Sequence, residues 1–556
     1  MNKLIFILTI AAILRFWNLW IVPPSVSLDE ASIGYNAYSV LKTGGDEYGE
    51  FPIISQRGYD DWRRSTYLFL TLPFITFFDL NVVSVRLPAV ILSVFTVAAT
   101  YFLVRELFPK ANKFSIFSAR WRIQFSIAEI ASLLLAISPW HIYISRLGHE
   151  SNACLSFLVF GVLFFLQGDK DKSIGKIFLS MIFFTLSMIS YYSGQALIPL
   201  FVVGLFFLYR KNILSIVLSD KKILIPFLTF LILLIPVVMA IFSPEALIRF
   251  QGTSTFKPEA HSEMFAKRVE LRNKAVESND IVGTILYSRH LFPIQVFIEG
   301  YLSHFKPEWL FTNSSSQPHK VPNLGLLYIW QAPFILIGVV LFVFSRIIDI
   351  RAKQLIFLWF FLGPLPAALA TQAPHAMRSY NFVLIWQIFA AFGLGYAFYK
   401  LQKFKILTLF AFAIFILFSL LTFYKNYFVI FPKEQSSSFQ YALSRTMPFV
   451  MKHEKEYNKI VFSNQDNLYQ SYMFFLFYSK YDPKLYQKQG GTKSGGFAET
   501  HAFGKFELRP IIWNKEQKND NILYVGNASD FPEGQKTLFT GYDLDEKNSV
   551  KVVKGE

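Results

Sequence analysis

Two adjacent carboxylates, Asp29 and Glu30, stand shortly beyond the first hydrophobic stretch of the chain. Apolar residues then repeat at helical spacing over 31–41, so we expect an amphipathic helix lying along a membrane surface. Ser27 and Glu30 have the spacing of a capping box, which is the structural alternative to a chemical role for Glu30. Asp29 has no such task, and the amides and dipole at a helix N-terminus would keep it ionised. Its carboxylate is therefore a candidate general base or metal ligand, with a solvated surface residue as the alternative.

The same loop carries more charge in the segment Tyr59-Asp-Asp-Trp-Arg-Arg64. Asp61 would add a second carboxylate, and Arg63 a guanidinium, which binds phosphate through two parallel hydrogen bonds. Two carboxylates that face a phosphate also form an oxygen-rich site for a hard divalent cation. Asp29 and Asp61 are therefore the candidate ligands if the protein uses a metal ion.

Two later segments carry further candidates of both charges. Arg146 and Glu150 stand four residues apart, hence on one face of any helix there, and a structural ion pair is the alternative to a role in a site. His375 and Arg378 lie in the segment Ala373-Pro-His-Ala-Met-Arg-Ser-Tyr380, at the end of a hydrophobic stretch. An arginine at that depth is costly without an anionic partner, and the phosphate of a lipid would be such a partner.

A mixed aromatic and basic segment, Gly300-Tyr-Leu-Ser-His-Phe-Lys-Pro-Glu-Trp-Leu-Phe311, contains Tyr301, His304 and Trp309. These side chains are suited to stacking on sugar rings, and an aromatic belt at a membrane interface is the alternative. The histidines of the chain are too scattered for a recognisable zinc site.

The elements that must position these residues are mostly membrane helices. Of the 556 residues, 53% are hydrophobic and only 17% are charged, and the mean hydropathy is positive, which lies outside the usual range of a soluble chain. The net charge of +16 comes from short basic clusters between apolar stretches, a pattern that indicates membrane topology and not nucleic-acid binding. The single cysteine, Cys154, excludes a disulfide framework and a cysteine metal site.

A membrane core of about 30 Å needs about 20 apolar residues in a helix, and positive short loops mark the cytoplasmic side. Both tests agree if residues 67–78 form a short interfacial or re-entrant helix that does not cross. About eleven spans follow: 4–22, 82–104, 126–140, 153–167, 177–192, 196–209, 223–242, 325–345, 354–370, 380–399 and 406–424. We expect the first of them to be retained and not removed as a signal peptide. The N-terminus is then cytoplasmic, and the loops 23–66 and 243–323 lie outside with the C-terminus.

The tail, 425–556, has the composition of a soluble domain. It contains strand-like stretches at 459–463 and 521–525 and a helix-like stretch at 467–478, so we expect a small extracytoplasmic α/β domain after a membrane domain that covers 1–424. No internal repeat of fixed period is visible, which weakens a solenoid or an inverted-repeat transporter.

Several of these segments resemble bacterial membrane glycosyltransferases of the GT-C class, in the branch related to protein O-mannosyltransferases and the lipid A aminoarabinose transferase. The shared motifs are Leu-Asp-Glu-Ala after the first span, Lys42-Thr-Gly-Gly-Asp-Glu-Tyr-Gly49, Asp-Trp-Arg before the short helix, Arg86-Leu-Pro88, Ser-Pro-Trp-His, Tyr-Leu-Ser-His-Phe-x-Pro-Glu-Trp-Leu-Phe and Pro-His-Ala-Met-Arg. The resemblance covers about residues 1–425 and implies the GT-C fold.

The resemblance also implies roles for single residues. It assigns Asp29, with Glu30 beside it, to the reacting hydroxyl, and it aligns further acidic residues with Asp61, to within one position, and with Glu150. The chain departs from the family in having Arg63-Arg64-Ser65 where Lys-Pro-Pro is frequent, and in having no Asp at the position given to Glu150.

We therefore expect the transfer of a sugar, with inversion, from a polyprenyl-phosphate carrier to an acceptor hydroxyl at the outer face of a bacterial plasma membrane. Asp29 would take the proton of the acceptor, and Arg63, Arg146 and Arg378 would stabilise the departing phosphate. A divalent metal ion is the one cofactor left open, and the acceptor is a protein, a lipid or a glycan. A transporter or flippase is the alternative, although it would place ionisable residues near the membrane midplane. An adhesion or scaffold protein is the third class.

Overall fold

The computed structural model describes residues 2–59, 61–109, 126–219, 222, 224–243, 252–256, 261–312, 319–492 and 500–556, with the main chain alone at 61, 216–219, 224, 236, 240, 402 and 405. The contacts divide the chain into two compact units. The first unit comprises Met1–Ile10, Phe95–His141 and Cys154–Ser419, and the second comprises Ala11–Val94, Ile142–Ala153 and Leu420–Glu556.

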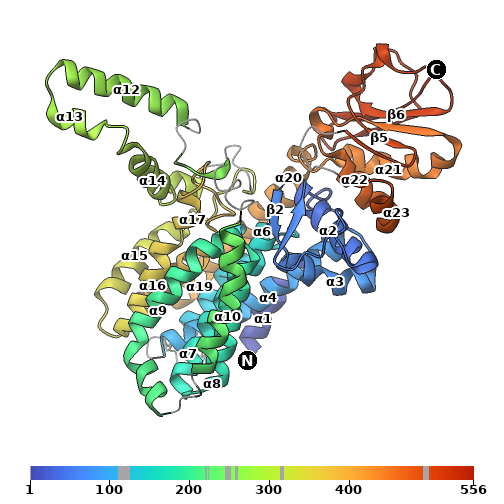
Figure 1. Cartoon of the computed structure of the whole chain (residues 1–556). Helices are drawn as coiled ribbons and strands as arrows, with labels where there is room; N and C mark the ends of the chain where they lie inside the picture. The colour runs from blue at the N-terminus through green and yellow to red at the C-terminus, as the bar shows by residue number, and fades with distance from the viewer. Residues whose placement is uncertain are drawn as a thin grey trace. The chain divides into compact units, whose positions relative to one another are not determined.

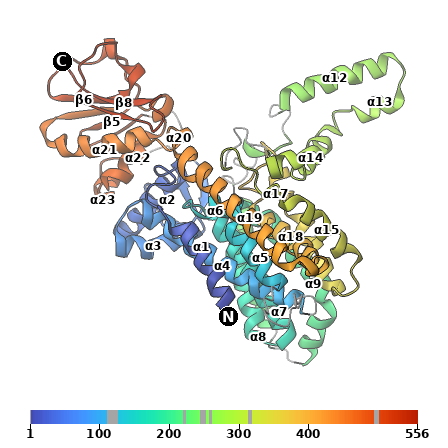
Figure 2. The same ribbon diagram turned by 180° about the vertical axis from the view of Figure 1, so that it is seen from behind.

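The first unit is built from helices, which lie side by side in both views (Figures 1 and 2). They are α5 (Ile127–Ile137), α7 (Glu150–Asp171), α8 (Ile174–Ser190), α9 (Tyr192–Ser219), α10 (Leu224–Ile241), α15 (Gln331–Phe344), α16 (Ile350–Leu362), α18 (Val383–Lys400) and α19 (Lys405–Phe423). Helices α15 and α18 approach closely at Gly338 and Gly393, where a Cβ would stand 1.9 Å from a main-chain oxygen of the opposite helix. Small residues of this kind let two membrane helices pack backbone to backbone.

The long segment that was expected to lie outside, 243–323, contributes three helices to the first unit. They are α12 (Ser262–Glu277), α13 (Ile281–Leu286) and α14 (Phe292–Ser303), followed by a π-helical turn at Glu308–Thr312.

Every span expected from the sequence overlaps helical structure, but 17–22 and 325–330 are not helical, and not all helices reach membrane length. Within the described residues, five helical stretches are long and apolar enough to cross a membrane: Val82–Leu107, Glu150–Asp171, Tyr192–Ser215, Tyr380–Lys400 and Ile406–Glu434. A sixth candidate is the pair of α5 and α6 (Pro139–Ser145), which bend by 56° at their break. The protein is thus a multi-pass membrane protein, and the total of eleven spans stays a prediction.

The second unit begins with the end of α1 (Asn2–Phe16), which stops six residues before the predicted span does, as turns follow from Trp17. Helix α2 (Leu28–Thr43) runs through the predicted amphipathic segment. An antiparallel hairpin of β1 (Ser55–Gly58) and β2 (Asp61–Arg64) comes next, and the sequence did not predict it. Helix α3 (Thr66–Phe78) is the expected short helix, and α4 (Val82–Leu107) follows it.

The tail forms the expected small α/β domain around a six-stranded mixed sheet of order β4-β5-β3-β6-β8-β7. The predicted strands are confirmed as β3 (Lys459–Phe462) and β6 (Ile522–Asn527), which pair in parallel. The other strands are β4 (His501–Phe503), β5 (Phe506–Leu508), β7 (Phe539–Tyr542) and β8 (Ser549–Lys554), and the helices include α21 (Tyr441–His453), α22 (Ser471–Ser479) and α23 (Pro483–Lys488).

The loop after α1 and the tail share one hydrophobic core inside the second unit. Buried residues of α2, among them Tyr35, cluster with Phe474 and Phe477 of α22. A Cβ on Gly34 would stand 2.6 Å from the ring of Phe477, so only glycine lets α2 and α22 pack this closely. The tail therefore packs directly on the helix that begins with Asp29.

Candidate active site

Glu30 is held entirely inside the protein at the start of α2. Ser27 Oγ accepts from the Glu30 amide at 3.2 Å, and the Ser27 amide donates to Glu30 Oε2 at 2.8 Å, which confirms the capping box. Glu30 Oε1 also accepts from the Gly148 amide at 2.9 Å and from Arg86 Nε at 2.7 Å. With its side chain only 1% exposed, Glu30 cannot reach a substrate, so we assign it a structural role instead of the catalytic one expected from the sequence.

Arg86 is the partner that makes the burial of Glu30 possible. Its guanidinium is fully buried in the first turns of α4, and it donates to the carbonyl oxygens of Leu19 at 3.0 Å, Pro23 at 3.1 Å and Ser25 as well as to Glu30. The pair therefore connects the chain after α1 to the start of α2 and of α4. The sequence carried one usable signal, because an arginine at the edge of a membrane helix needs an anionic partner.

Asp29 lies beside Glu30 but has the opposite environment. Its side chain is 38% exposed, and Oδ1 stands 2.6 Å from Arg63 Nη2. Its other oxygen, Oδ2, stands 3.4 Å from Nε2 of His149, and the same nitrogen lies 3.4 Å from Oε2 of Glu150. The structure thus brings together three of the predicted residues, Asp29, Arg63 and Glu150, and places the aspartate where a ligand can reach it.

His149 is the residue of this cluster that sequence reasoning missed. Burial lowers the pKa of its ring, but the charges of Glu150 and Asp29 outweigh that effect, so its pKa is raised above the ordinary value. Nδ1 accepts from the Ser151 amide at 3.1 Å, which leaves the proton on Nε2, between the two carboxylates. The sequence gave only a weak signal for a role of His149 in this cluster, which is that a histidine stands next to an acidic residue just before a helix begins.

Arg146 does not have the role that the sequence suggested. The chain is not helical at 146–149, so Arg146 and Glu150 share no helix and the expected pairing on one face is wrong. The buried guanidinium donates to the carbonyl oxygens of Leu14 at 3.2 Å, Arg15 at 2.6 Å and Val22 at 2.7 Å. These carbonyls come from the last turn of α1 and the turns after it, which leave backbone acceptors unsatisfied. Arg146 is therefore assigned to binding these carbonyl groups and not to binding a phosphate.

The predicted pair of Asp29 and Asp61 cannot be compared with the structure, because the side chain of Asp61 lies outside the described part of the chain. In the hairpin, Asp61 pairs with Gly58 and Arg63 pairs with Gln56, so both residues lie on strand β2. Among the side chains described, no group of three or more His, Cys, Asp or Glu is arranged to hold a metal ion. The catalytic role of Asp61 and the metal site stay predictions.

A second set of candidates lies in the first unit, where His375 and Arg378 occupy one turn. The Arg378 amide donates to His375 Nδ1 at 3.3 Å, and Arg378 Nη1 donates to the Thr371 carbonyl at 2.6 Å. The ring of His319 lies 5.4 Å from that of His375. The neighbouring Lys320 is buried, which lowers its pKa to about 8. His319, Lys320, His375 and Arg378 are called the cationic cluster below.

Two of the three residues expected to bind a sugar are buried in the first unit. His304 is fully buried between the Gly300 carbonyl, 2.8 Å from Nδ1, and the His375 amide, which donates to Nε2 at 3.3 Å. Burial lowers the pKa of His304 to about 4, so the ring is neutral. The buried Trp309 packs on His304 at 5.0 Å. Neither ring is available for stacking on a sugar, which corrects the expectation, and both support the main chain at His375.

Tyr301, the third residue, is partly exposed, and its hydroxyl donates to the Phe361 carbonyl at 2.8 Å. Trp140, from the Ser-Pro-Trp-His motif, donates to the Ala376 carbonyl at 2.9 Å and packs on Trp309 at 5.7 Å. Motifs far apart in the sequence are therefore joined around the turn that carries His375.

Comparison with known proteins relates part of the chain to a family. The sequence profile of the dolichyl-phosphate-mannose-protein mannosyltransferase family matches residues 67–240, which include Arg86, His149 and Glu150. This segment is therefore similar to that family, in agreement with the resemblance to GT-C glycosyltransferases that the motifs indicated. No curated protein sequence matches the chain.

The fold of the chain is similar to solved structures over a larger part of its length. ArnT from Cupriavidus metallidurans, bound to undecaprenyl phosphate, is 10% identical with a TM-score of 0.54, over 99% of this chain and 98% of that one. This likeness shows a GT-C fold. The oligosaccharyltransferase AglB from Archaeoglobus fulgidus, in complex with an inhibitory peptide and a dolichol-phosphate, is 15% identical with a TM-score of 0.48, and 86% of this chain spans 63% of its length.

Proposed function

We propose that the protein is an inverting glycosyltransferase that moves a sugar from a polyprenyl-phosphate carrier to an acceptor hydroxyl at the outer face of a bacterial plasma membrane. The observation that carries the proposal is the Asp29 carboxylate, partly exposed at the N-terminus of α2 and flanked by the guanidinium of Arg63 and the ring of His149. The match to a family named for a lipid-phosphate sugar donor supports the same class of reaction. The solved ArnT with undecaprenyl phosphate supports the choice of lipid.

In this mechanism Asp29 is the general base. It takes the proton of the acceptor hydroxyl while the hydroxyl oxygen attacks the anomeric carbon, and the bond from that carbon to the phosphate oxygen breaks with its electron pair leaving on the phosphate. Attack from the side opposite the phosphate inverts the anomeric configuration. The sugar is already activated by its phosphate link, so no soluble nucleotide takes part.

Arg63 can serve the base and the leaving group in turn. Its guanidinium lies 2.6 Å from Asp29, and the phosphodiester of the donor, whose single negative charge is shared by two oxygens, can accept two parallel hydrogen bonds from it. When the donor binds, the phosphate would draw Arg63 away and free that oxygen of Asp29 for the hydroxyl proton. His149, held by its second carboxylate partner Glu150, keeps the other oxygen of Asp29 in place.

The cationic cluster of the first unit contains His375 and Arg378, which we also propose as phosphate-binding residues. Lys320, His375 and Arg378 offer several positive or hydrogen-bonding groups on adjoining turns, and oriented donors of this kind stabilise charge that develops on a leaving phosphate. Lys320 Nζ is held at 2.7 Å by the Trp309 carbonyl, so its ammonium is fixed in direction before any anion arrives.

The test is the change Asp29→Asn, measured in membranes supplied with a polyprenyl-phosphate-linked sugar. Loss of a general base lowers turnover by roughly 100-fold or more, with little change in protein level, since the carboxylate is not buried. Glu50→Gln removes an exposed carboxylate of the same loop and is the matched control, which should turn over like wild type. Wild-type turnover by the Asp29→Asn protein would remove Asp29 from the mechanism.

A further inference from the structure

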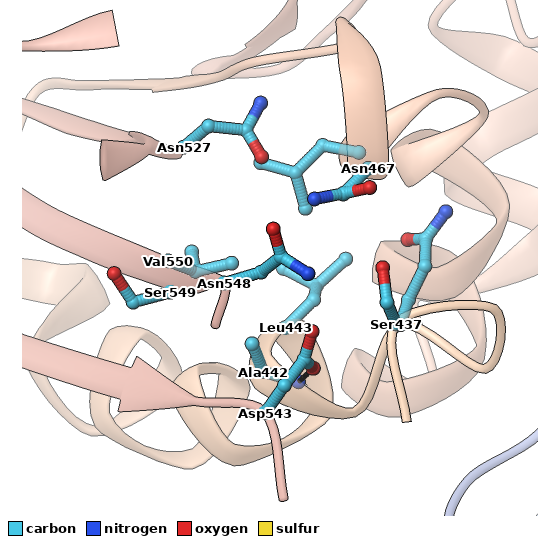
Figure 3. A pocket seen from close by; sticks show the side chains of 11 residues that line it. Ser437, Ala442, Leu443, Asn467, Asn527, Asp543, Asn548, Ser549 and Val550 are labelled. Carbon is cyan, nitrogen blue, oxygen red and sulfur yellow. Dashed lines mark hydrogen bonds between the residues drawn. The ribbon is translucent and has the colours of Figure 1, made fainter. Parts of the chain in front are cut away.

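The two units contain hollows of very different size. In the tail, the amide side chains of Asn467, Asn527 and Asn548 gather around a hollow of about 10 Å³ (Figure 3), which is room for a single water molecule. A groove in the first unit encloses about 570 Å³, a volume typical of sites that hold a large organic ligand. Of these two, only the groove can hold a ligand.

The groove lies between α9, α15 and α16, which are neighbours in the helical unit (Figure 1). Its apolar lining includes Phe207, Leu208, Val343, Phe357, Leu358 and Phe361. A Cβ on Gly204 of α9 would stand 2.4 Å from the side chain of Leu358, so α9 and α16 touch at this point. Phe357 of α16 packs on Phe342 of α15, with ring centroids 5.8 Å apart. The walls of the groove are therefore held in place by helix packing.

The groove has the length of one half of a membrane core. Along α16 its lining runs from Ile350 to Phe361, which is about 16 Å at about 1.5 Å per residue, and one leaflet of a core of about 30 Å is about 15 Å thick. The wall formed by α9 is long and apolar enough to cross a membrane. Phe207 and Phe361 are 60% and 57% exposed, so the groove opens to the surroundings of the helices. An acyl chain of one lipid matches this length and this lining.

One end of the groove carries a lysine that is held in a fixed direction. Lys353 lines the groove near the start of α16. Its Nζ donates to the Val343 carbonyl at 2.9 Å and to the Ser345 carbonyl at 2.5 Å, both at the end of α15. An ammonium group has three donors, so the third can bind an anion at this end of the groove.

Other basic residues lie close to Lys353. Arg351 stands over the ring of Tyr209 on α9, 5.8 Å from its centroid, and Arg346 is exposed in the turn between α15 and α16. Asp349 is the one acidic residue within 345–354, and its carboxylate caps α16 by accepting from the Arg351 amide at 2.8 Å. Three basic residues against one acidic residue leave this turn positively charged.

The basic end of the groove lies away from the cationic cluster that contains His375 and Arg378. The basic turn precedes α16, whereas the short helix α17 (Leu365–Ala368) and then the turn with His375 follow it. His304 binds the His375 amide, and Tyr301 of the same segment donates to the Phe361 carbonyl, near the end of α16. Because α16 is about 20 Å long, a single lipid phosphate cannot contact both its ends.

We propose that the groove binds one phospholipid with an anionic headgroup. One acyl chain lies along the apolar lining, and the headgroup phosphate lies at Lys353, with Arg346 and Arg351 nearby. The positive turn attracts an anionic headgroup, and it repels the ammonium of a zwitterionic one. The sequence predicts that this basic turn is cytoplasmic, so the lipid belongs to that leaflet. The inference does not depend on the proposed transfer reaction.

The test measures the first lipid that binds to the full-length protein in detergent, by native mass spectrometry. Phosphatidylglycerol and phosphatidylcholine with the same acyl chains are titrated separately. We expect phosphatidylglycerol to bind at least about fivefold more tightly, since each basic residue beside an anionic headgroup contributes about this factor. Lys353→Gln should lower this preference about fivefold. The preference is compared, and not the stability, because this change also removes the bonds from Lys353 to α15.

Two charge variants extend this comparison. Arg346→Gln changes an exposed residue of the basic turn, so it should fold normally and still lower the preference at least about twofold. Lys403→Gln removes an exposed cation of the next loop on the same predicted side of the membrane, and as the matched control it should keep the preference of wild type.

Two tryptophan variants test the groove itself. Val343→Trp fills the groove and should weaken the binding of both lipids at least about tenfold, because a filled groove buries no acyl chain. Phe344→Trp changes the neighbouring residue, which is 77% exposed and does not line the groove, and should bind like wild type. Equal affinity for the two lipids, or wild-type binding by Val343→Trp, would overturn the proposal. Displacement of bound phosphatidylglycerol by a polyprenyl phosphate would also overturn it, because the groove would then hold the carrier.

Discussion

Neighbouring acidic residues at the start of α2 have opposite roles. Glu30 is enclosed by Arg86, Ser27 and the Gly148 amide, whereas Asp29 points to a place where a ligand can reach it. Successive residues of a helix point about 100° apart, so one faces the protein core and the other the loop. The buried pair fixes the position of the helix start, and the partly exposed carboxylate is the proposed general base.

The structural role of Glu30 predicts a large loss of stability when its charge is removed. Glu30→Gln leaves the guanidinium of Arg86 buried without an anion, which should cost roughly 3–5 kcal/mol. The unfolding temperature in detergent measures this loss. Asp29→Asn is the matched neighbouring change, and its unfolding temperature should be close to that of wild type. The double change Glu30→Leu with Arg86→Met should be less destabilised than Glu30→Gln alone. Equal unfolding temperatures for Glu30→Gln and wild type would contradict the assignment.

His149 predicts a stabilisation that depends on pH. Its pKa is raised in the folded protein by Glu150 and Asp29, which outweigh burial, so the folded state binds a proton more tightly than the unfolded state. The stabilisation is fully present below the unfolded pKa of about 6.5 and is lost as pH rises through the higher folded pKa. The unfolding temperature of wild type should exceed that of His149→Asn at pH 6 by more than at pH 9. A constant difference would mean that the ring is neutral throughout.

At the scale of elements, the loops around the site are ordered by side chains that satisfy helix ends. The capping box of Ser27 and Glu30 starts α2, and Arg146 binds the carbonyl groups that the end of α1 leaves unsatisfied. The hairpin of β1 and β2 carries Arg63 to Asp29. Each of these elements is short, and together they bring residues far apart in the sequence to one place.

The segment after α2 contains a buried acid that joins the first loop to the tail. Glu47 is fully buried and accepts from Thr492 Oγ1 at 2.6 Å and from the Tyr472 hydroxyl at 3.2 Å. Burial raises its pKa to about 7, despite these donors, and the adjacent Asp46 adds to the rise. This junction therefore holds its acid most readily in the protonated form.

The raised pKa of Glu47 predicts that stability falls as pH rises. The folded state binds the proton more tightly than the unfolded state, so the contribution is present below the unfolded pKa of about 4.3 and is lost as pH passes about 7. Thermal unfolding from pH 5 to pH 8.5 should show this decline in wild type and in the control Glu50→Gln. It should be shallower in Glu47→Gln, and an equal slope in all three proteins would contradict the prediction.

At the scale of the whole molecule, the proposed chemistry requires that the first loop and the tail lie outside the cell. The protein has one cysteine, Cys154, which is buried and so reacts slowly with thiol reagents. Single cysteines can therefore be introduced at exposed positions, and their labelling can be measured with little background labelling of Cys154.

We predict that an impermeant maleimide labels intact cells that carry Glu50→Cys or Glu546→Cys. It should not label Lys172→Cys until the membrane is opened, because that loop is expected inside with other basic residues. All three positions are exposed in the structure, so differences report the side of the membrane and not burial. Labelling of Lys172→Cys but not Glu50→Cys in intact cells would place Asp29 in the cytoplasm and exclude the proposed reaction.

Local and compositional signals determined much of this protein from its sequence alone. The capping box, the helical stretches, the short helix at 66–78 and the strands at 459–462 and 522–527 depend on neighbours in the chain, which periodicity and residue type reveal. Asp29 could be singled out because its position past the first span and at a helix start was itself a local feature.

The tertiary structure alone decided which charged groups meet. Glu30 pairs with Arg86 across 56 positions, His149 joins Asp29, and Arg146 turns to carbonyl groups instead of Glu150. Burial withdrew His304 and Trp309 from the surface, and a shared core joined the tail to the first loop. These outcomes depend on desolvation and on packing between segments that are far apart in the sequence. Both decide whether burying a charged or aromatic group stabilises or destabilises the fold. The spacing of residues along one sequence does not contain this information.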